Sequence, residues 1–288
     1  MTPRAKILAT ISVLVVCVIG VFLWLSTRTP APVEPALEAV RAERRAVIGT
    51  SQEGRSIEAY TFGNGSKTLL FVGGIHGGYE WNTVLLAYQF IDYLSQHASD
   101  IPDTLSVVVI PSANPDGVYK VVGKEGRFTQ ADVSPDASVQ ASGRFNARSV
   151  DLNRNFECAW KPEATWRSKT VSAGSAPFSE AETQVLQQFI LTTQPVGVVF
   201  WHSQANTVYA GDCAGVFLPL SLSMMNEYAS AAGYQRAETF DSYPVTGSAD
   251  GWLTTINIPS ITVELQTHES VEWDKNLAGS KALFSLFK

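Results

Sequence analysis

The sequence is short of cysteine and shows no internal repetition. Only three of its 288 residues are cysteines, and no pair has the C-x-x-C spacing of a thiolate metal site. No motif recurs at periods of about 20–50 residues, which excludes a solenoid or a propeller. No G-x-S-x-G motif follows an apolar run, which argues against a serine hydrolase.

Charged residues are also sparse, at 17% of the chain, and the net charge is −6. Residues 1–28 hold three basic residues and no acid, so the rest carries 18 basic against 27 acidic residues, a net charge of −9. An acidic body disfavours binding to a phosphate backbone, and we expect no nucleic-acid partner. The 45% hydrophobic content excludes a disordered chain and is enough for one large globular domain.

The N-terminus contains a long uncharged run. Residues 7–26 are twenty residues without a charge, the length needed to cross a bilayer. A cleaved signal peptide, which would make the protein secreted, is the alternative, but no small-x-small cleavage site follows Leu25. The basic residues before the run predict a cytoplasmic stub at 1–6, a single-pass anchor in the cell membrane and a body outside the cytoplasm. Residues 27–44 predict a proline-rich stalk, and residues 45–288 form the predicted catalytic domain.

Two cysteines, Cys158 and Cys213, lie in the body of the chain. In an oxidising compartment two such residues favour a disulfide over a thiolate metal site, which would need a closer spacing.

Four short apolar runs rich in β-branched or aromatic residues predict buried strands, at 69–72, 107–110, 198–201 and 261–263. Helical patterns occur at 84–94, 179–193, 219–234 and 273–284. Residues 46–62 predict a hairpin. This alternation predicts a single α/β domain whose mixed, largely parallel central sheet is flanked by helices.

Potential metal ligands follow these strands, at the sheet edge where α/β proteins bind ligands. The first run leads into His76 and Glu80, the third into His202, and the fourth ends at Glu264. Two imidazoles and one carboxylate are the ligand set of hydrolytic zinc, and a further carboxylate can take a proton from water. The sequence therefore predicts a catalytic metal site at this edge.

With these residues the sequence resembles the zinc carboxypeptidases of the carboxypeptidase A type, over roughly residues 45–287. Five ordered motifs carry the resemblance: the Gly-rich His76–Glu80 turn, Asn-Pro-Asp-Gly at 114–117, Val-Asp-Leu-Asn-Arg-Asn-Phe at 150–156, His-Ser at 202–203 and Val-Glu-Leu at 263–265. The leading hairpin and the Gly-Arg-Phe-Asn segment at 143–146 look like the bacterial branch that trims cell-wall peptides.

The resemblance implies that one zinc ion per chain is bound by His76, Glu80 and His202, with Asp151 orienting a ligand imidazole from behind. The family usually has two residues between its first histidine and its glutamate, whereas this chain has three. Glu80 is a ligand only if the glycine-rich turn absorbs the extra residue.

The resemblance also implies roles around the metal. Glu264 would be the general base and then the acid, and Arg144 would stabilise the oxyanion. Asn153 and Arg154 would bind the free C-terminal carboxylate of a peptide substrate, and Tyr243 would close over the bound residue.

Several alternatives stay open. Arg148 could replace Arg144, although the Arg-x-Asn pattern favours Arg144. Either Ala249 or Asp250 occupies the position where many relatives carry a specificity residue, so basic or diamino-acid ends are one option. The other two histidines, His97 and His268, are expected at the surface or beside a ligand.

These features predict a zinc metallocarboxypeptidase that releases a C-terminal residue from a peptide, with cell-wall stem peptides as candidate substrates. An N-acyl amino acid deacylase of the same fold and a non-catalytic peptide- or glycan-binding module are the alternatives. Asn153, Arg154 and Tyr243 together favour the peptidase, and the presence of all metal ligands and the base disfavours the binding module. The sequence leaves the configuration of the terminal residue and the oligomeric state open.

Overall fold

The computed structural model describes residues 43–288. The predicted stub, the predicted anchor at 7–26 and nearly all of the predicted stalk lie outside these residues and stay predictions. Within residues 43–288, no helix is long and apolar enough to cross a membrane.

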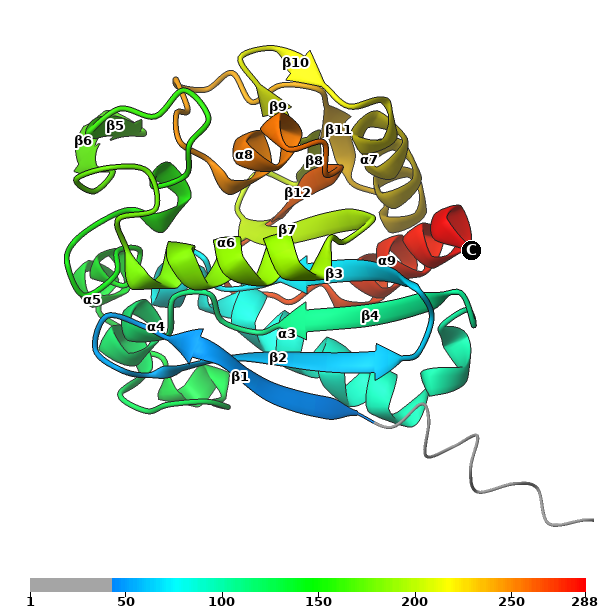
Figure 1. The fold of residues 1–288 in the computed structure, drawn as a ribbon. Coiled ribbons are helices and arrows are strands. Elements are labelled where there is room, and N and C mark those ends of the chain that lie inside the picture. Colours follow the sequence, from blue (N-terminus) through cyan, green and yellow to red (C-terminus); the bar gives the residue numbers. More distant parts are fainter. Residues whose placement is uncertain (1–42) are drawn as a thin grey trace, which may run out of the picture. The chain divides into compact units, whose positions relative to one another are not determined.

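The centre of the fold is an eight-stranded mixed sheet (Figure 1). In spatial order its strands are β1 (Arg44–Thr50), β2 (Ser56–Gly63), β4 (Leu105–Ile110), β3 (Lys67–Val72), β7 (Gly197–Ser203), β12 (Ser260–Leu265), β8 (Thr207–Ala210) and β11 (Gln235–Ala237). The four central strands, β4 to β12, are mutually parallel, and antiparallel pairs flank them. The predicted mixed, largely parallel sheet is confirmed.

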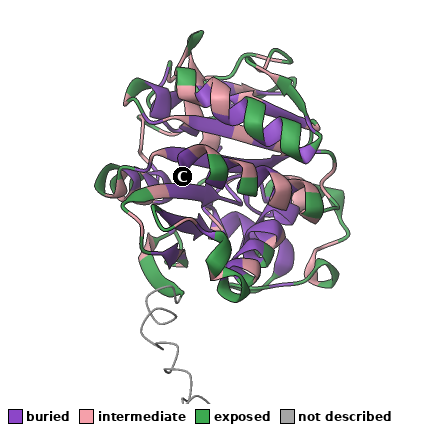
Figure 2. Cartoon of the chain, turned by 90° about the vertical axis from the view of Figure 1, so that its right-hand side faces the viewer, coloured by how far each residue is buried: buried purple, intermediate pink, exposed green. Residues whose placement is uncertain are grey.

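Helices cover both faces of this sheet, which explains why the central strands read as continuous apolar runs. One face packs on α3 (Trp81–Gln96), α7 (Pro219–Ala232) and α9 (Trp273–Phe287), and the other on α6 (Ala181–Thr193) and α8 (Ala249–Thr255). Successive residues of β3 alternate between the two cores, with Leu69 and Phe71 on the first face and Leu70 and Val72 on the second. Figure 2 shows the buried residues concentrated in the sheet and on the inner sides of the helices.

The predicted strands and helices all form, with small shifts at their ends. The helix expected from residue 179 begins at Ala181 instead, and Glu180 occupies the N-cap position. Ser179 precedes the N-cap position, and its hydroxyl oxygen accepts hydrogen bonds from the Asn155 side chain and the Ser175 N–H instead of capping the helix.

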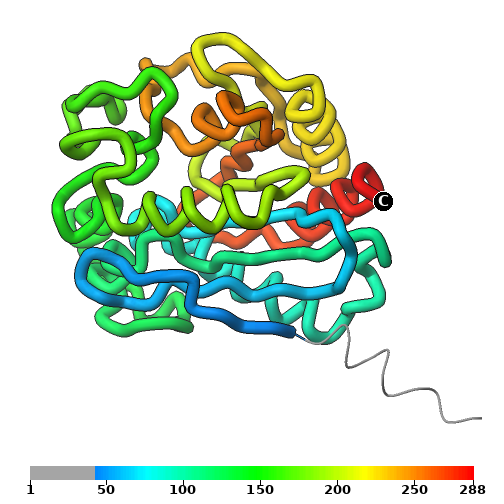
Figure 3. The backbone as a smooth tube through the Cα atoms, viewed as in Figure 1, coloured from blue at the N-terminus to red at the C-terminus, as the bar shows by residue number. Residues whose placement is uncertain are grey.

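The segment between β4 and α6 gathers at the carboxyl ends of the central strands (Figures 1 and 3). It contains α4 (Pro115–Val122), α5 (Ala137–Ser142), the 3₁₀ turns η3 (Gln130–Asp132) and η4 (Leu152–Arg154), and the hairpin of β5 (Glu163–Trp166) and β6 (Lys169–Ser172). The turn η1 (Gly77–Glu80) links β3 to α3, η2 (Ala98–Asp100) follows α3, and β9 (Asp212–Cys213) pairs with β10 (Val216–Phe217). These short elements build the walls of the site.

Candidate active site

Three buried side chains meet at the carboxyl ends of β3 and β7, and each presents a metal-ligating atom to the others. His76 Nδ1 lies 2.8 Å from Glu80 Oε1, and His202 Nδ1 lies 3.1 Å from Glu80 Oε2. The two Nδ1 atoms are 3.2 Å apart, and all the ligating atoms lie within 4.8 Å of one another. Glu80 Oε2 is buried and accepts no hydrogen bond from the described residues. Two imidazoles and one carboxylate in this arrangement fit one zinc ion with an open coordination position.

The protonation of these side chains suits a metal. Burial raises the pKa of Glu80, but the neighbouring His76 and His202 outweigh burial and hold that pKa below its ordinary value. Burial lowers the pKa of His202, which favours the neutral imidazole that metals bind.

The extra residue between His76 and Glu80 is absorbed by the turn η1. Gly77 adopts a φ of +49°, and a Cβ there would lie 2.4 Å from the carbonyl oxygen of Gly143. The turn therefore needs glycine, and it still returns Glu80 to hydrogen-bond distance of His76.

Asp151 lies behind the metal cluster and orients two of its neighbours. Its Oδ1 faces His76 Nε2 at 3.5 Å, and its Oδ2 lies 2.8 Å from both Nε and Nη2 of Arg144. A carboxylate on this side of the His76 ring favours a proton on Nε2 and leaves the Nδ1 lone pair for the metal. Burial raises the pKa of Asp151, but Arg144, Arg154 and His76 hold it well below its ordinary value.

Arg144 is fixed by Asp151 and by an aromatic ring, while Nη1 stays on the side of the metal cluster. Its Cζ lies 4.6 Å from the ring centroid of Trp166, and Nη1 lies 3.9 Å from Glu80 Oε1. The Arg148 side chain is 52% exposed, and this residue is not part of the pocket lining. The geometry therefore favours Arg144 as the oxyanion residue.

Glu264 lies beside the metal ligands because β12 pairs with β7 in parallel register. That register places Glu264 opposite His202, and both residues line one pocket. Burial and the negative charge of Glu80 raise the pKa of Glu264 well above its ordinary value, with Arg144 opposing the shift. A carboxyl group with a raised pKa beside a metal site suits a general base.

Asn153 and Arg154 lie on η4 and keep hydrogen-bond donors free. Nε and Nη2 of Arg154 each donate to Thr165 O at 3.2 Å, and Nη1 donates to Asn153 O at 2.7 Å. These bonds use three of the five guanidinium N–H groups. Asn153 Oδ1 accepts the Ala249 N–H at 2.9 Å. The amide nitrogen of Asn153 therefore points away from Ala249 and can donate to another group. Two guanidinium N–H groups and this nitrogen form no hydrogen bond within residues 43–288, so they can donate to a carboxylate.

One pocket of about 220 Å³ joins these groups. Its lining contains most of the predicted site, namely His76, Arg144, Asn153, Arg154, His202, Tyr243 and Glu264. Tyr243 is half-buried, and its ring packs edge-on against Phe240 at 4.8 Å. Glu80 and Asp151 do not line this pocket.

The wall also carries two acids. Ala249, the first residue of α8, is buried in the core, whereas Asp250 lines the pocket together with Asp212. Asp212 accepts the Gly215 N–H, and Asp250 accepts the N–H of its successor and the Thr262 hydroxyl. Within the described part of the chain, neither carboxylate forms an ion pair with lysine or arginine within 4.0 Å.

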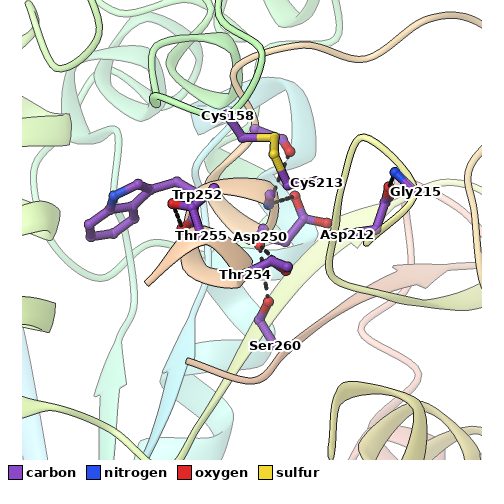
Figure 4. Close-up of a disulfide and its surroundings, with 11 residues drawn as sticks. Cys158, Asp212, Cys213, Gly215, Asp250, Trp252, Thr254, Thr255 and Ser260 are labelled. Carbon is purple, nitrogen blue, oxygen red and sulfur yellow. Dashed lines mark hydrogen bonds between the residues drawn. A yellow bond between two sulfur atoms is a disulfide. The ribbon is translucent and has the colours of Figure 1, made fainter. Parts of the chain in front are cut away.

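A disulfide between Cys158 and Cys213 tethers this wall (Figure 4). It joins the loop after η4 to the β9–β10 hairpin, directly beside Asp212. Burial raises the pKa of Asp212, and the charge of Asp250 raises it further, against the hydrogen bond from Gly215.

Some neighbours of the site carried no sequence signal. Trp166 and Thr165 lie on a hairpin that the hydrophobic pattern does not reveal, and Asp212 could have been noticed only through its cysteine neighbour. His97 is exposed, as expected for one of the two remaining histidines, whereas His268 is half-buried and contacts Ser203.

Fold and site together define a metal-dependent hydrolase with an α/β fold, whose candidate metal centre lies at the carboxyl ends of the parallel strands of a mixed sheet. The chain belongs to the zinc carboxypeptidase family, whose sequence pattern matches residues 41–277. This family uses one zinc ion, and membership places the chain among hydrolases that act on peptide bonds. The predicted family is confirmed.

Individual relatives agree with this assignment. Murein peptide amidase A of Escherichia coli (strain K12) is 32% identical over 164 residues, which cover 54% of this chain and 62% of that protein. Human carboxypeptidase Z is 33% identical over 122 residues, 38% of this chain and 17% of that protein. The matches thus span less than two thirds of these curated relatives.

Solved structures share the fold. Carboxypeptidase A of Helicoverpa armigera superposes with a TM-score of 0.62 at 19% identity, over 87% of this chain and 70% of that one. Murein-tripeptide amidase of Escherichia coli O157 superposes with a TM-score of 0.57 at 22% identity, over 88% and 95% of the respective chains.

Proposed function

We propose that this protein is a zinc carboxypeptidase that releases the C-terminal residue of a peptide. The pocket carries this proposal, because the candidate metal ligands His76 and His202 and the candidate carboxylate-binding residues Asn153 and Arg154 line it together. A pocket of about 220 Å³ with carboxylate donors in its wall suits one terminal residue with a free carboxylate.

The residues divide the reaction between them. When bound, the zinc ion supplies Lewis-acid chemistry that polarises the scissile carbonyl and lowers the pKa of water. Glu264 takes the proton of the attacking water and passes it to the leaving amine. Arg144 donates from Nη1 to the developing oxyanion, since Nε and Nη2 are held by Asp151. Asn153 and Arg154 hold the terminal carboxylate.

We propose that the substrate is a murein peptide whose terminal residue carries an amino group in its side chain. The name of the bacterial relative, murein peptide amidase A, supports the first part. Asp212 and Asp250 support the second, because two carboxylates in the pocket wall, neither of which forms an ion pair with lysine or arginine within 4.0 Å among residues 43–288, favour a cation.

The test is an assay of the purified protein on free-acid peptides that end in lysine, diaminopimelate or phenylalanine, and on N-acyl amino acids. We expect release of the terminal residue, fastest from lysine and diaminopimelate ends. Hydrolysis of the N-acyl amino acids alone would identify a deacylase instead. Binding of peptides without turnover by the zinc-loaded protein would identify a binding module.

We also propose that residues 7–26 anchor the protein in the membrane with residues 45–288 outside the cytoplasm. The uncharged run, the basic residues before it and the disulfide of the folded domain support this location. Protease added to spheroplasts should then degrade the domain, and protection of the domain until the cells are lysed would refute the orientation.

A further inference from the structure

A chain of side-chain hydrogen bonds lies beside the metal cluster and is not part of the pocket lining. Ser203 Oγ is 3.0 Å from Asn82 Oδ1 and 2.7 Å from His268 Nδ1. The Asn82 amide nitrogen donates to the backbone oxygens of Thr267 at 2.7 Å and Ser270 at 2.9 Å. Asn82 and Ser203 are buried, so each of these bonds replaces a contact with water.

Counting donors and acceptors fixes the direction of this chain. Asn82 Nδ2 uses both of its N–H groups on backbone oxygens, so Asn82 Oδ1 is the acceptor of the Ser203 hydroxyl proton. Ser203 Oγ then accepts the N–H of His268 Nδ1. The remaining ring nitrogen, His268 Nε2, is buried and has no hydrogen-bond partner among the described residues.

The three members of this chain each stand close in sequence to a residue of the metal centre. Asn82 follows Glu80 by two residues, Ser203 directly follows His202, and His268 follows Glu264 by four residues. His202 and Glu264 are already aligned by the pairing of β7 with β12. Glu80 has no such support, because it ends a 3₁₀ turn outside the sheet.

We propose that Asn82, Ser203 and His268 form a positioning brace that holds Glu80 in place relative to His202 and Glu264. The brace joins the first turn of α3 to the end of β7 and to the loop after β12 through hydrogen bonds of the buried Asn82 and Ser203 and the half-buried His268. It thereby sets the affinity of the zinc site and the rate of turnover.

The same brace explains the extra residue in the ligand spacing. Tyr79 is the last of the three residues between His76 and Glu80, and its ring lies 4.6 Å from the His268 ring and 5.2 Å from the Trp166 ring. Placed there, the Tyr79 ring packs against the His268 imidazole at one end of the brace.

The test uses the full-length protein with His268→Leu and Ser203→Ala, which remove the brace, and His268→Asn, which keeps a donor for Ser203. The matched control is Asn276→Ala. Asn276 is buried like Asn82 and hydrogen-bonded to Tyr228 and Tyr234, but it lies on α9 and belongs neither to the metal-ligand group nor to the pocket lining. Zinc affinity is measured by competition with a chromophoric chelator, alongside kcat, KM and the melting temperature.

We expect both disruptive variants to weaken zinc binding by about 10–100-fold and to lower kcat at zinc saturation with little change in KM. His268→Asn should restore zinc affinity close to the wild-type value, and Asn276→Ala should lower the melting temperature without changing zinc affinity. Unchanged zinc affinity in both disruptive variants, or an equal loss in Asn276→Ala, would overturn the proposal. Zinc binding is read without a substrate, so this result stands apart from any failure of the proposed peptidase activity.

Discussion

The proposed contact between Arg154 and the substrate carboxylate gives the sharpest prediction. The guanidinium is 2% exposed and held by the backbone oxygens of Thr165 and Asn153, so it is oriented before the substrate arrives. Its two free N–H groups can form charge-assisted hydrogen bonds to a free carboxylate. A C-terminal amide has no charge and offers one acceptor oxygen instead of two.

The magnitude follows from this count. A hydrogen bond to a charged group contributes about 1.5–3 kcal/mol, and a buried charge left facing an amide loses part of its compensation as well. A total near 3 kcal/mol corresponds to a loss of about 100-fold or more in kcat/KM for the amidated peptide. In Arg154→Ala the free-acid and amidated peptides should be cleaved at similar low rates, because the discriminating group is gone. Arg154→Lys should restore only part of the preference, since an ammonium lacks the planar fork.

The assay compares kcat/KM for the free-acid and amidated forms of one good substrate in the wild type, Arg154→Ala and Arg148→Ala. Arg148 is the matched control because its side chain is 52% exposed and outside the pocket lining, and its removal should leave the preference unchanged. Equal cleavage of both forms by the wild type would identify an endopeptidase and refute the assignment of Arg154.

Three further predictions concern stability, catalysis and specificity. Replacing both Cys158 and Cys213 by serine removes a cross-link between residues 55 apart. The free energy of unfolding should fall by about 4 kcal/mol and the melting temperature by about 10 °C. A melting temperature unchanged within error would contradict this prediction. Glu264→Gln should abolish turnover while metal analysis still finds one zinc ion per chain, and residual wild-type activity would remove Glu264 from the mechanism. Asp250→Asn should reduce the preference for lysine over phenylalanine ends measured as a ratio of kcat/KM, more so when combined with Asp212→Asn, and an unchanged ratio would exclude a cation-binding role.

The sheet and its ligands were predictable because their signals are local. A strand covered on both faces is a short apolar run, and the residues that follow parallel strands meet at one edge. His76, His202 and Glu264 could therefore be placed together from the sequence. In the structure, the parallel pairing of β7 with β12 places Glu264 opposite His202, as that reasoning expects.

The walls of the site were not predictable because they depend on contacts between distant segments. Thr165 orients Arg154 through a backbone oxygen, which any residue type would offer. Trp166 stacks on Arg144 from a strand of four residues, which is too short for a hydrophobic pattern to predict it. The partnership of Asn82 with Ser203 spans 121 residues of sequence, and neither residue type indicates the other.

The Asn-Pro-Asp-Gly motif at 114–117 has a structural role in the site and no proposed catalytic one. Asn114 caps α4 by accepting the Gly117 N–H, and its amide nitrogen donates to the backbone oxygen of Arg144 at 3.4 Å. A Cβ at Gly117 would lie 2.3 Å from the carbonyl oxygen of Gly143, so a larger residue would displace the segment that carries Arg144. The motif therefore fixes the position of Arg144, the proposed oxyanion residue, through the backbone of Gly143 and Arg144.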